Sequence, residues 1–196
     1  MSSVKQPVTA MDKQDSRHAP ARQRLRDAIY ALVLERGFDG FTVNDLLRRS
    51  GVARSSFYAH YRDKEDLLLH GFEEIGSPAC TADPTAPNAS QDLPDFAHWI
   101  FVATEDSKAL TRSLREGSSR ALVDQHLRNI LTVQVREGLR TRQRDSTVPL
   151  ELAVRFHVGA LMSMWQWWVE HDFPTPARAM AEHFNRLMRE GLLPPP

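Results

Sequence analysis

Apolar residues recur along this chain at intervals of three and four, the spacing that lines one face of an α-helix. The longest stripe runs from Leu122 through Leu127, Leu131 and Val135 to Leu139. It predicts a helix of about six turns. Neither an internal repeat nor a strand-like alternation of apolar and polar residues accompanies this pattern. The sequence therefore predicts an all-α fold.

Proline and glycine residues indicate where several of these helices begin and end. Pro20 can open a first helix because its missing N–H is not needed in the first turn, and Gly37 closes that helix. Near the C-terminus, Pro149 and Pro176 begin two further helices, and Gly191 ends the last one.

The segments between the helices predict how the chain is divided into domains. Residues 1–19 are polar and without periodicity, which predicts a disordered tail. Residues 76–91 contain three prolines and predict a connecting loop. This loop separates a small domain at residues 20–75 from a larger one at residues 92–196. Within the larger domain, a break between two helices is expected near Asp106.

A tight turn joins two short helices in the small domain. Thr42 and Asp45 have the spacing of a capping box at the start of the first short helix. Gly51 ends this helix, since a turn between crossed helices often needs a residue that tolerates positive φ. The second short helix is predicted from Ala53 to Tyr61. Together they predict a helix-turn-helix, which places the first residues of its second helix against base edges in DNA.

The outward face of the second short helix carries Arg54, Ser55 and Ser56, while Phe57 and Tyr61 face inward. An arginine can pair bidentately with guanine, and short polar side chains suit a close approach to the major groove. Arg54 is therefore the best single candidate for direct base readout. The alternative is that Arg54 contacts only phosphate.

The segment between about residues 22 and 72 resembles the N-terminal domain of TetR-family transcriptional regulators. This resemblance implies a fold of about nine helices, in which the C-terminal domain binds an effector and forms a dimer. It rests on agreement in both spacing and residue type. The matching residues are Arg36-Gly37-Phe38, Thr42, Asp45-Leu46, Gly51-Val52-Ala53, Phe57-Tyr58, His60-Tyr61 and Lys64-Glu65-Asp66-Leu67-Leu68.

The resemblance also implies a set of DNA contacts, in which phosphate contacts flank those to base edges. Each has a competing role: Thr42 is also a helix cap, and Tyr58 could pack at the surface. Lys64 stands at the start of a fourth helix, predicted from Asp63 to about Ile75, whose amides favour an anion. The expected DNA contacts are Thr42, Tyr58, His60 and Lys64 to phosphates, and Arg54, Ser55 and Ser56 to bases.

Charge is unevenly distributed along the chain, although the net charge of the whole is zero. Residues 1–64 contain 12 Lys and Arg against 7 Asp and Glu, whereas residues 65–196 contain 13 against 18. The positive half includes the predicted helix-turn-helix, as attraction to DNA phosphates requires.

Composition and motifs exclude several other classes of protein. The single cysteine, Cys80, excludes an internal disulfide, and no signal peptide or membrane-spanning segment is evident, which predicts a cytoplasmic protein. Nucleotide-binding glycine loops, His-Glu-x-x-His, paired cysteines and serine nucleophile motifs are also missing. The histidines are scattered. We therefore expect no enzymatic activity, no cofactor and no metal site.

The last two predicted helices are more apolar than a monomer core of this size requires. Small residues among them would let two backbones approach closely, and the family resemblance also implies a dimer formed by this helix pair. The alternative is that these residues are ordinary core. The expected dimer contacts are Phe156, Gly159, Ala160, Ser163, Trp167, Phe184, Leu187 and Met188.

Aromatic and polar residues of the larger domain predict an effector pocket with an apolar lining and a few polar anchors. For each aromatic residue, core packing is the competing explanation. The expected lining is Phe96, Trp99, Phe101, His126, Gln134, Met162, Trp165 and Gln166.

These observations predict a homodimeric, ligand-responsive transcriptional regulator. In this interpretation it is a repressor that binds a palindromic operator and is released by a small apolar or aromatic effector. One alternative is a helical protein-interaction module that does not bind DNA specifically. Another is a DNA-binding regulator controlled by a protein partner.

Overall fold

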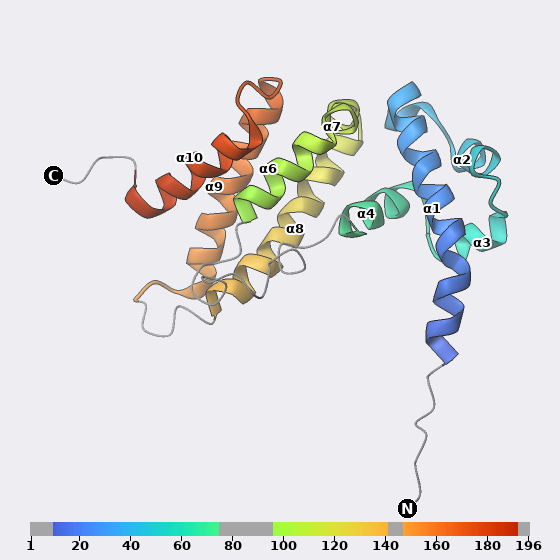
Figure 1. Ribbon diagram of the computed structural model, residues 1–196, viewed down its shortest axis with the longest axis horizontal. Helices are drawn as coiled ribbons and strands as arrows, with labels where there is room; N and C mark the ends of the chain where they lie inside the picture. Colours follow the sequence, from blue (N-terminus) through green and yellow to red (C-terminus); the bar gives the residue numbers. More distant parts are fainter. Residues whose placement is uncertain (1–9, 75–95, 141–146, 192–196) are drawn as a thin grey trace, which may run out of the picture.

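A computed structural model describes residues 10–74, 96–140 and 147–191, and all structural statements below concern these residues. They form nine α-helices and one 3-10 helix, and no strand occurs among them. The predicted all-α fold is thus confirmed. Figure 1 shows two parts: a head of α1 to α4, drawn blue to teal, and a core of α6 to α10, drawn green to red.

The head is built from four α-helices and a 3-10 turn. Every element contributes a fully buried residue to its hydrophobic centre: Ile29, Phe38, Leu46, Phe57 and Leu68. The short helices could not bury these side chains separately, so their packing depends on α1. The elements are α1 (Ala10–Arg36), η1 (Phe38–Gly40), α2 (Val43–Ser50), α3 (Arg54–Tyr58) and α4 (Lys64–Glu74).

The core is a bundle of five helices in which α8 packs on α9 and α10 packs on α6. Trp168 lies at its centre, with the rings of Phe101 and Phe173 edge-on at 5.3 and 4.8 Å. Its indole N–H donates to the carbonyl of Thr175 at 2.7 Å, which satisfies the polar atom. The elements are α6 (Phe96–Asp106), α7 (Lys108–Leu114), α8 (Ser119–Arg140), α9 (Leu150–Glu170) and α10 (Ala177–Glu190).

Most predicted helix boundaries agree with the structure. Gly51 adopts the left-handed conformation at φ 65°, and its N–H caps α2 by donating to the carbonyl of Leu47. Pro149 and Pro176 are the N-cap residues of α9 and α10, and α6 ends at Asp106. These boundaries depend on local backbone preferences, which is why sequence signals located them.

Two boundaries differ from the prediction. The structure begins α1 at Ala10, so the predicted tail is too long and Pro20 lies within the helix. A proline gives up one backbone hydrogen bond there, and a helix of 27 residues continues past it. The second helix of the helix-turn-helix, α3, ends earlier than predicted, at Tyr58. The predicted start of α4 is confirmed, because the Asp63 carboxylate accepts from the Asp66 N–H at 2.7 Å and caps the helix just before Lys64. The predicted loop at residues 76–91 and helix start at Asp92 lie outside the described residues.

The fourth helix lies between the two parts of the molecule. In Figure 1, α4 extends from the head toward α8, with which it is in contact. A second contact joins α1 to α7. The head is therefore attached to the core at two places that lie on different helices.

Candidate DNA-reading surface and ligand pocket

The start of α2 is fixed by the predicted capping box. The Thr42 hydroxyl accepts from the Asp45 N–H at 3.3 Å, and the Asp45 carboxylate accepts from the Thr42 N–H at 3.0 Å. The Thr42 hydroxyl also donates to the Asp45 carboxylate at 2.7 Å, and this bond together with the one from the Thr42 N–H holds the pKa of Asp45 below its usual value. The Thr42 side chain is a helix cap and also lies on the surface, where we predict a phosphate contact.

The outer face of α3 presents Arg54 and Ser55 to solvent, with Ser56 half-buried beside them. Phe57 and Tyr61 are buried beneath, with ring centroids 5.8 Å apart, as their spacing predicts. The Arg54 guanidinium donates to the side-chain carbonyl of Asn44 on α2 and lies 6.0 Å from the Tyr58 ring centroid. Arg54 is thus held against both helices at the exposed surface.

The two candidate phosphate contacts that follow, Tyr58 and His60, are also exposed. Half of the Tyr58 side chain is accessible to solvent, and its ring lies edge-on to the buried Phe57 at 5.1 Å. This packing fixes the direction of the ring while leaving much of it accessible. Together with Arg54, these residues form the surface from which we expect DNA to be contacted.

Lys64 has a structural role that the sequence did not reveal. Its ammonium donates to the carbonyls of Phe38 at 2.7 Å and Phe41 at 3.0 Å. It also lies over both aromatic rings, 4.4 and 4.8 Å from their centroids. Two of its three donors are therefore engaged within the head. Its phosphate contact stays a prediction, and the same ammonium would have to bind the phosphate while it donates to these two carbonyls.

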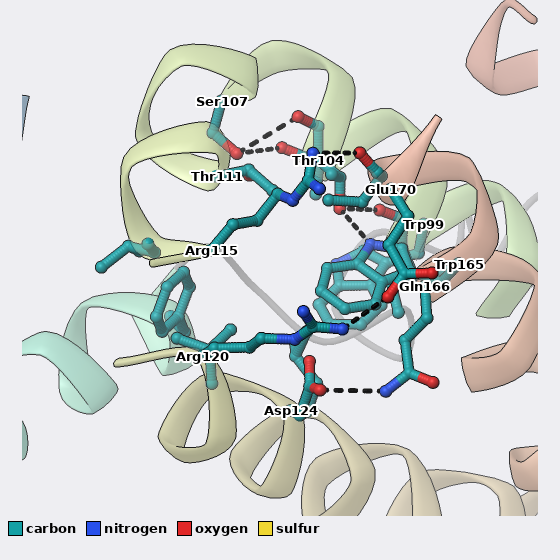
Figure 2. Close-up of a pocket in the computed structure, with 17 residues that line it drawn as sticks. Trp99, Thr104, Ser107, Thr111, Arg115, Arg120, Asp124, Trp165, Gln166 and Glu170 are labelled. Atoms are coloured by element: carbon teal, nitrogen blue, oxygen red, sulfur yellow. Dashed lines mark hydrogen bonds and ion pairs between the residues drawn. The ribbon is translucent and has the colours of Figure 1, made fainter. Parts of the chain in front are cut away.

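A pocket opens in the core between α6, α7, α8 and α9, and Phe72 of α4 completes its wall. Figure 2 shows these side chains converging on it from four sides. The residues that line it are Phe72, Trp99, Ile100, Ala103, Thr104, Ser107, Thr111, Leu114, Arg115, Arg120, Val123, Asp124, Leu127, Trp165, Gln166, Val169 and Glu170.

Three of the eight predicted effector residues, Trp99, Trp165 and Gln166, line this pocket. The other five do not. Phe101 packs on Trp168 in the core centre, because two residues along a helix from Trp99 it points to the opposite side. Phe96 and Met162 are buried elsewhere, His126 has its ring 6.4 Å from that of Phe72, and Gln134 is half-buried on α8.

Several polar lining residues were missed by the sequence prediction. Trp165 donates from its indole nitrogen to the Thr104 hydroxyl at 2.9 Å, and that hydroxyl donates to the carbonyl of Ile100 at 2.7 Å. Ser107 lies one turn beyond Ala103 on the same face as Trp99. Helical spacing from Trp99 would therefore have found this face of α6.

Charged side chains form one rim of the pocket (Figure 2). Arg120 forms an ion pair with Glu170 across the opening, and Gln166 donates to Asp124 at 2.9 Å. Arg115 donates to the carbonyl of Val169 at 2.8 Å. These contacts join α7 and α8 to α9, and they could not be inferred from residue spacing because they cross between helices.

The outer faces of α9 and α10 expose large apolar side chains. Phe156 is 66% exposed, Trp167 47% and Leu187 39%. Six of the eight predicted dimer residues line one groove; the other two are Gly159 and Trp167, and Trp167 stacks on His171 at 4.6 Å. The groove is lined by Phe156, Ala160, Ser163, Met164, Phe184, Leu187, Met188 and Gly191.

Comparison with known families covers both parts of the chain. The family described as "Bacterial regulatory proteins, tetR family" matches residues 25–70. A second, described as "Transcriptional regulator C-terminal region", matches residues 91–190, about half of the chain. The chain belongs to the TetR family. It is a transcriptional regulator with an N-terminal helix-turn-helix DNA-binding domain, as the resemblance implied.

Proteins of low sequence identity match most of this chain. The fatty acid metabolism regulator protein of Bacillus subtilis (strain 168) is 21% identical over 192 residues, covering 88% of this chain and 96% of the relative. A structure assigned to the TetR family from Syntrophomonas wolfei has a TM-score of 0.68 at 18% identity, with 88% and 96% of the two chains covered. FadR from Bacillus subtilis in complex with stearoyl-CoA has a TM-score of 0.61 at 20% identity, with 87% and 99% covered.

The described ranges of this TetR-family chain contain neither a membrane-spanning helix nor a cluster of metal-ligating side chains. None of the helices described there has the length and apolarity needed to cross a membrane. In the same ranges, histidine, cysteine and carboxylate side chains do not gather in groups of three that could hold a metal ion.

The anchor at Lys64 leads to a testable prediction about stability. Lys64→Ala leaves two carbonyls of the head without their donor, so we expect the free energy of unfolding to fall by about 1–3 kcal/mol. Urea unfolding followed by circular dichroism measures this. Arg128→Ala is the control, expected to change stability by less than about 0.5 kcal/mol because that side chain is exposed. Equal stability of the two variants would contradict the anchor.

Proposed function

We propose that this protein is a ligand-responsive repressor that binds a palindromic operator as a homodimer and is released by an apolar or aromatic effector. One observation carries the proposal: α4 belongs to the DNA-binding head at Lys64 and lines the core pocket at Phe72. A ligand that displaces Phe72 therefore acts on the same rigid helix that holds the head.

The DNA-binding part of the proposal rests on the exposed face of α3. Arg54 meets base edges in the major groove, and Ser55 and Ser56 allow a close approach. Tyr58 and His60 contact the flanking phosphates, and these contacts fix orientation without specifying sequence. The cluster of basic residues in the first third of the chain attracts the operator before these contacts form.

The homodimer is supported by the exposed apolar groove of α9 and α10. A second copy of the same chain is the occupant proposed for it, because a two-fold axis lets one groove cover its equivalent. The large exposed side chains at Phe156 and Leu187 would then leave water. The same axis relates two heads, so that each reads one half of a palindrome.

The effector is proposed to be an apolar or aromatic molecule with at least one hydrogen-bond acceptor. Two tryptophans line the pocket, and the buried indole N–H of Trp99 has no hydrogen-bond partner within the described residues. Such a donor favours an acceptor on a ligand. One protein of similar fold, FadR from Bacillus subtilis, was solved in complex with stearoyl-CoA. Molecules with an acyl chain are therefore the first effectors to test.

Release follows from linkage between the two sites. If the effector prefers the conformation whose heads do not fit successive major grooves, ligand and operator weaken each other's binding by the same factor. A coupling of about 1–3 kcal/mol is typical and corresponds to about 5- to 150-fold in operator affinity.

The operator prediction is tested by selecting genomic fragments with the purified protein and titrating the recovered site at several salt concentrations. We expect a palindrome and a steep loss of affinity with salt. Tyr58→Ala should weaken binding to every site, whereas Arg54→Ala should lose about 1–3 kcal/mol of discrimination at one base pair. Arg128→Ala, an exposed arginine of the core, is the control. A folded protein that enriches no site would instead favour a protein-interaction module.

The dimer prediction is tested by placing a charge in the groove. Phe156→Glu would bury a carboxylate in an apolar interface, so we expect at least about a tenfold rise in the dimer dissociation constant. Analytical ultracentrifugation measures that constant. Leu34→Glu is the matched control, since Leu34 is 51% exposed but lies on the head. If both variants stay as dimeric as the wild type, the groove is not the interface.

The effector prediction is tested by operator titration with stearoyl-CoA, stearate or naphthoate present. At least one should raise the operator Kd by about tenfold or more. Ala103→Trp fills the pocket and should abolish this response, whereas Ala109→Trp adds the same ring at an exposed position outside the pocket. An operator Kd that none of the three compounds changes would overturn this effector class and leave operator binding intact.

A further inference from the structure

A carboxylate of the head is hydrogen-bonded to the core at a point away from α4. Asp39, in the η1 turn, accepts from the Ser118 N–H at 3.0 Å and from the Ser118 hydroxyl at 2.6 Å. Both carboxylate oxygens are used, and the two residues are separated by 79 positions in sequence. Ser118 lies in the turn between α7 and α8, so this contact joins head to core.

The neighbouring glycine is required by this contact in two independent ways. Gly117 has φ +69°, a conformation that residues with a side chain rarely adopt. A Cβ atom at this position would lie 1.9 Å from a carboxylate oxygen of Asp39, well inside any real contact. The Asp39 carboxylate can therefore approach the backbone of this turn only because position 117 has no side chain.

Each side of the contact is held in place by further hydrogen bonds. In the turn, the buried hydroxyl of Ser119 lies 3.0 Å from the carbonyls of both Leu114 and Glu116, which fixes the turn on the end of α7. In the head, the residue before Asp39 is Phe38, whose buried ring and carbonyl are held by Lys64. A contact between two segments held in this way fixes an angle, whereas a contact between flexible segments does not.

Residues before and after this turn both bond to α9 at the rim of the pocket. Arg115, three residues before Ser118, donates to the carbonyl of Val169 on α9. Arg120, two residues after it, forms an ion pair with Glu170 on the same helix. Both arginines line the pocket. A change in the distance between the turn and α9 therefore moves Ser118, and with it the attachment of Asp39.

We propose that Asp39, Gly117 and Ser118 form a further joint between head and core, which fixes the angle at which the DNA-binding head projects and passes changes at the pocket rim to it. Asp39 is a positioning residue in this proposal, since it acts on DNA binding only through the orientation of the head. The α4–α8 and α1–α7 contacts are the other attachments, and this joint removes the rotation of the head that those contacts alone would permit.

The test follows the orientation of the head through the distance between one spin label on the head and one on the core. Cys80→Ser removes the native cysteine, and Leu34→Cys with Arg128→Cys provides two exposed labelling positions. Labelled chains are diluted with unlabelled ones so that distances within one chain dominate. We expect a narrow distance distribution in this background and a broader or shifted one for Asp39→Ala and for Gly117→Ala.

Matched variants separate positioning from loss of stability. Asp39→Asn keeps an acceptor and adds a donor that can pair with the Ser118 hydroxyl, so it should preserve the narrow distribution. Glu35→Ala removes a carboxylate that accepts two hydrogen bonds from Arg49 within the head, so it should not alter the distribution. Unfolding midpoints confirm that every variant is folded during the measurement. Unchanged distributions in both Asp39→Ala and Gly117→Ala would overturn the joint.

Operator titration provides the functional arm, and only this arm rests on the proposed operator binding. A head that is no longer held must be ordered when DNA binds, so Asp39→Ala should weaken operator affinity by about three- to tenfold. Asp39→Asn should stay close to wild type. If no operator is found, the spin-label distances still show whether the joint exists. If an operator is found but the distances are unchanged in the variants, the joint is refuted while the proposed operator binding stands.

Discussion

The half-buried ammonium of Lys64 is the interaction on which the geometry of the head depends. An ammonium removed from water is costly unless its donors are satisfied, and here two carbonyls and two aromatic faces receive it. The carbonyls belong to Phe38, the first residue of η1, and to Phe41, which directly follows η1. The first residue of α4 thereby holds the segment that leads into the helix-turn-helix.

This anchor links the DNA-reading surface to the pocket through rigid structure. α4 is held to the head at Lys64, and two turns further on it offers Phe72 to the pocket wall. The η1 turn that Lys64 holds also carries Asp39, which contacts the turn between α7 and α8. Both routes between pocket and head therefore meet at η1. Packed interfaces of this kind tend to switch between two discrete arrangements and do not deform gradually.

The pocket combines an apolar lining with polar groups that are mostly satisfied internally. Thr104 and Trp165 bond each other, and the rim charges of Arg120 and Glu170 pair across the opening. Unpaired charges would lower the affinity for an apolar ligand, because they would have to be desolvated. Pairing at the rim keeps charge near solvent and leaves the interior to aromatic and aliphatic contacts.

Sequence alone determined the features that depend on a few neighbouring residues. The Thr42–Asp45 capping box, the left-handed Gly51 and the prolines that begin α9 and α10 each act through local backbone geometry. The helix-turn-helix and the family followed from these short-range patterns. The apolar face of the last helix pair was also readable, since helical spacing identifies which residues share a face.

Only the tertiary structure decided how distant segments meet. The role of Lys64 depends on carbonyls 23 and 26 positions away, and the joint at Asp39 on a hydroxyl 79 positions away. Aromatic residues such as Trp99 and Phe101 were indistinguishable as core or pocket, because helix packing determines which side of α6 encloses a cavity. Spacing specifies a face within one helix, whereas a site needs the faces of several helices brought together by their packing.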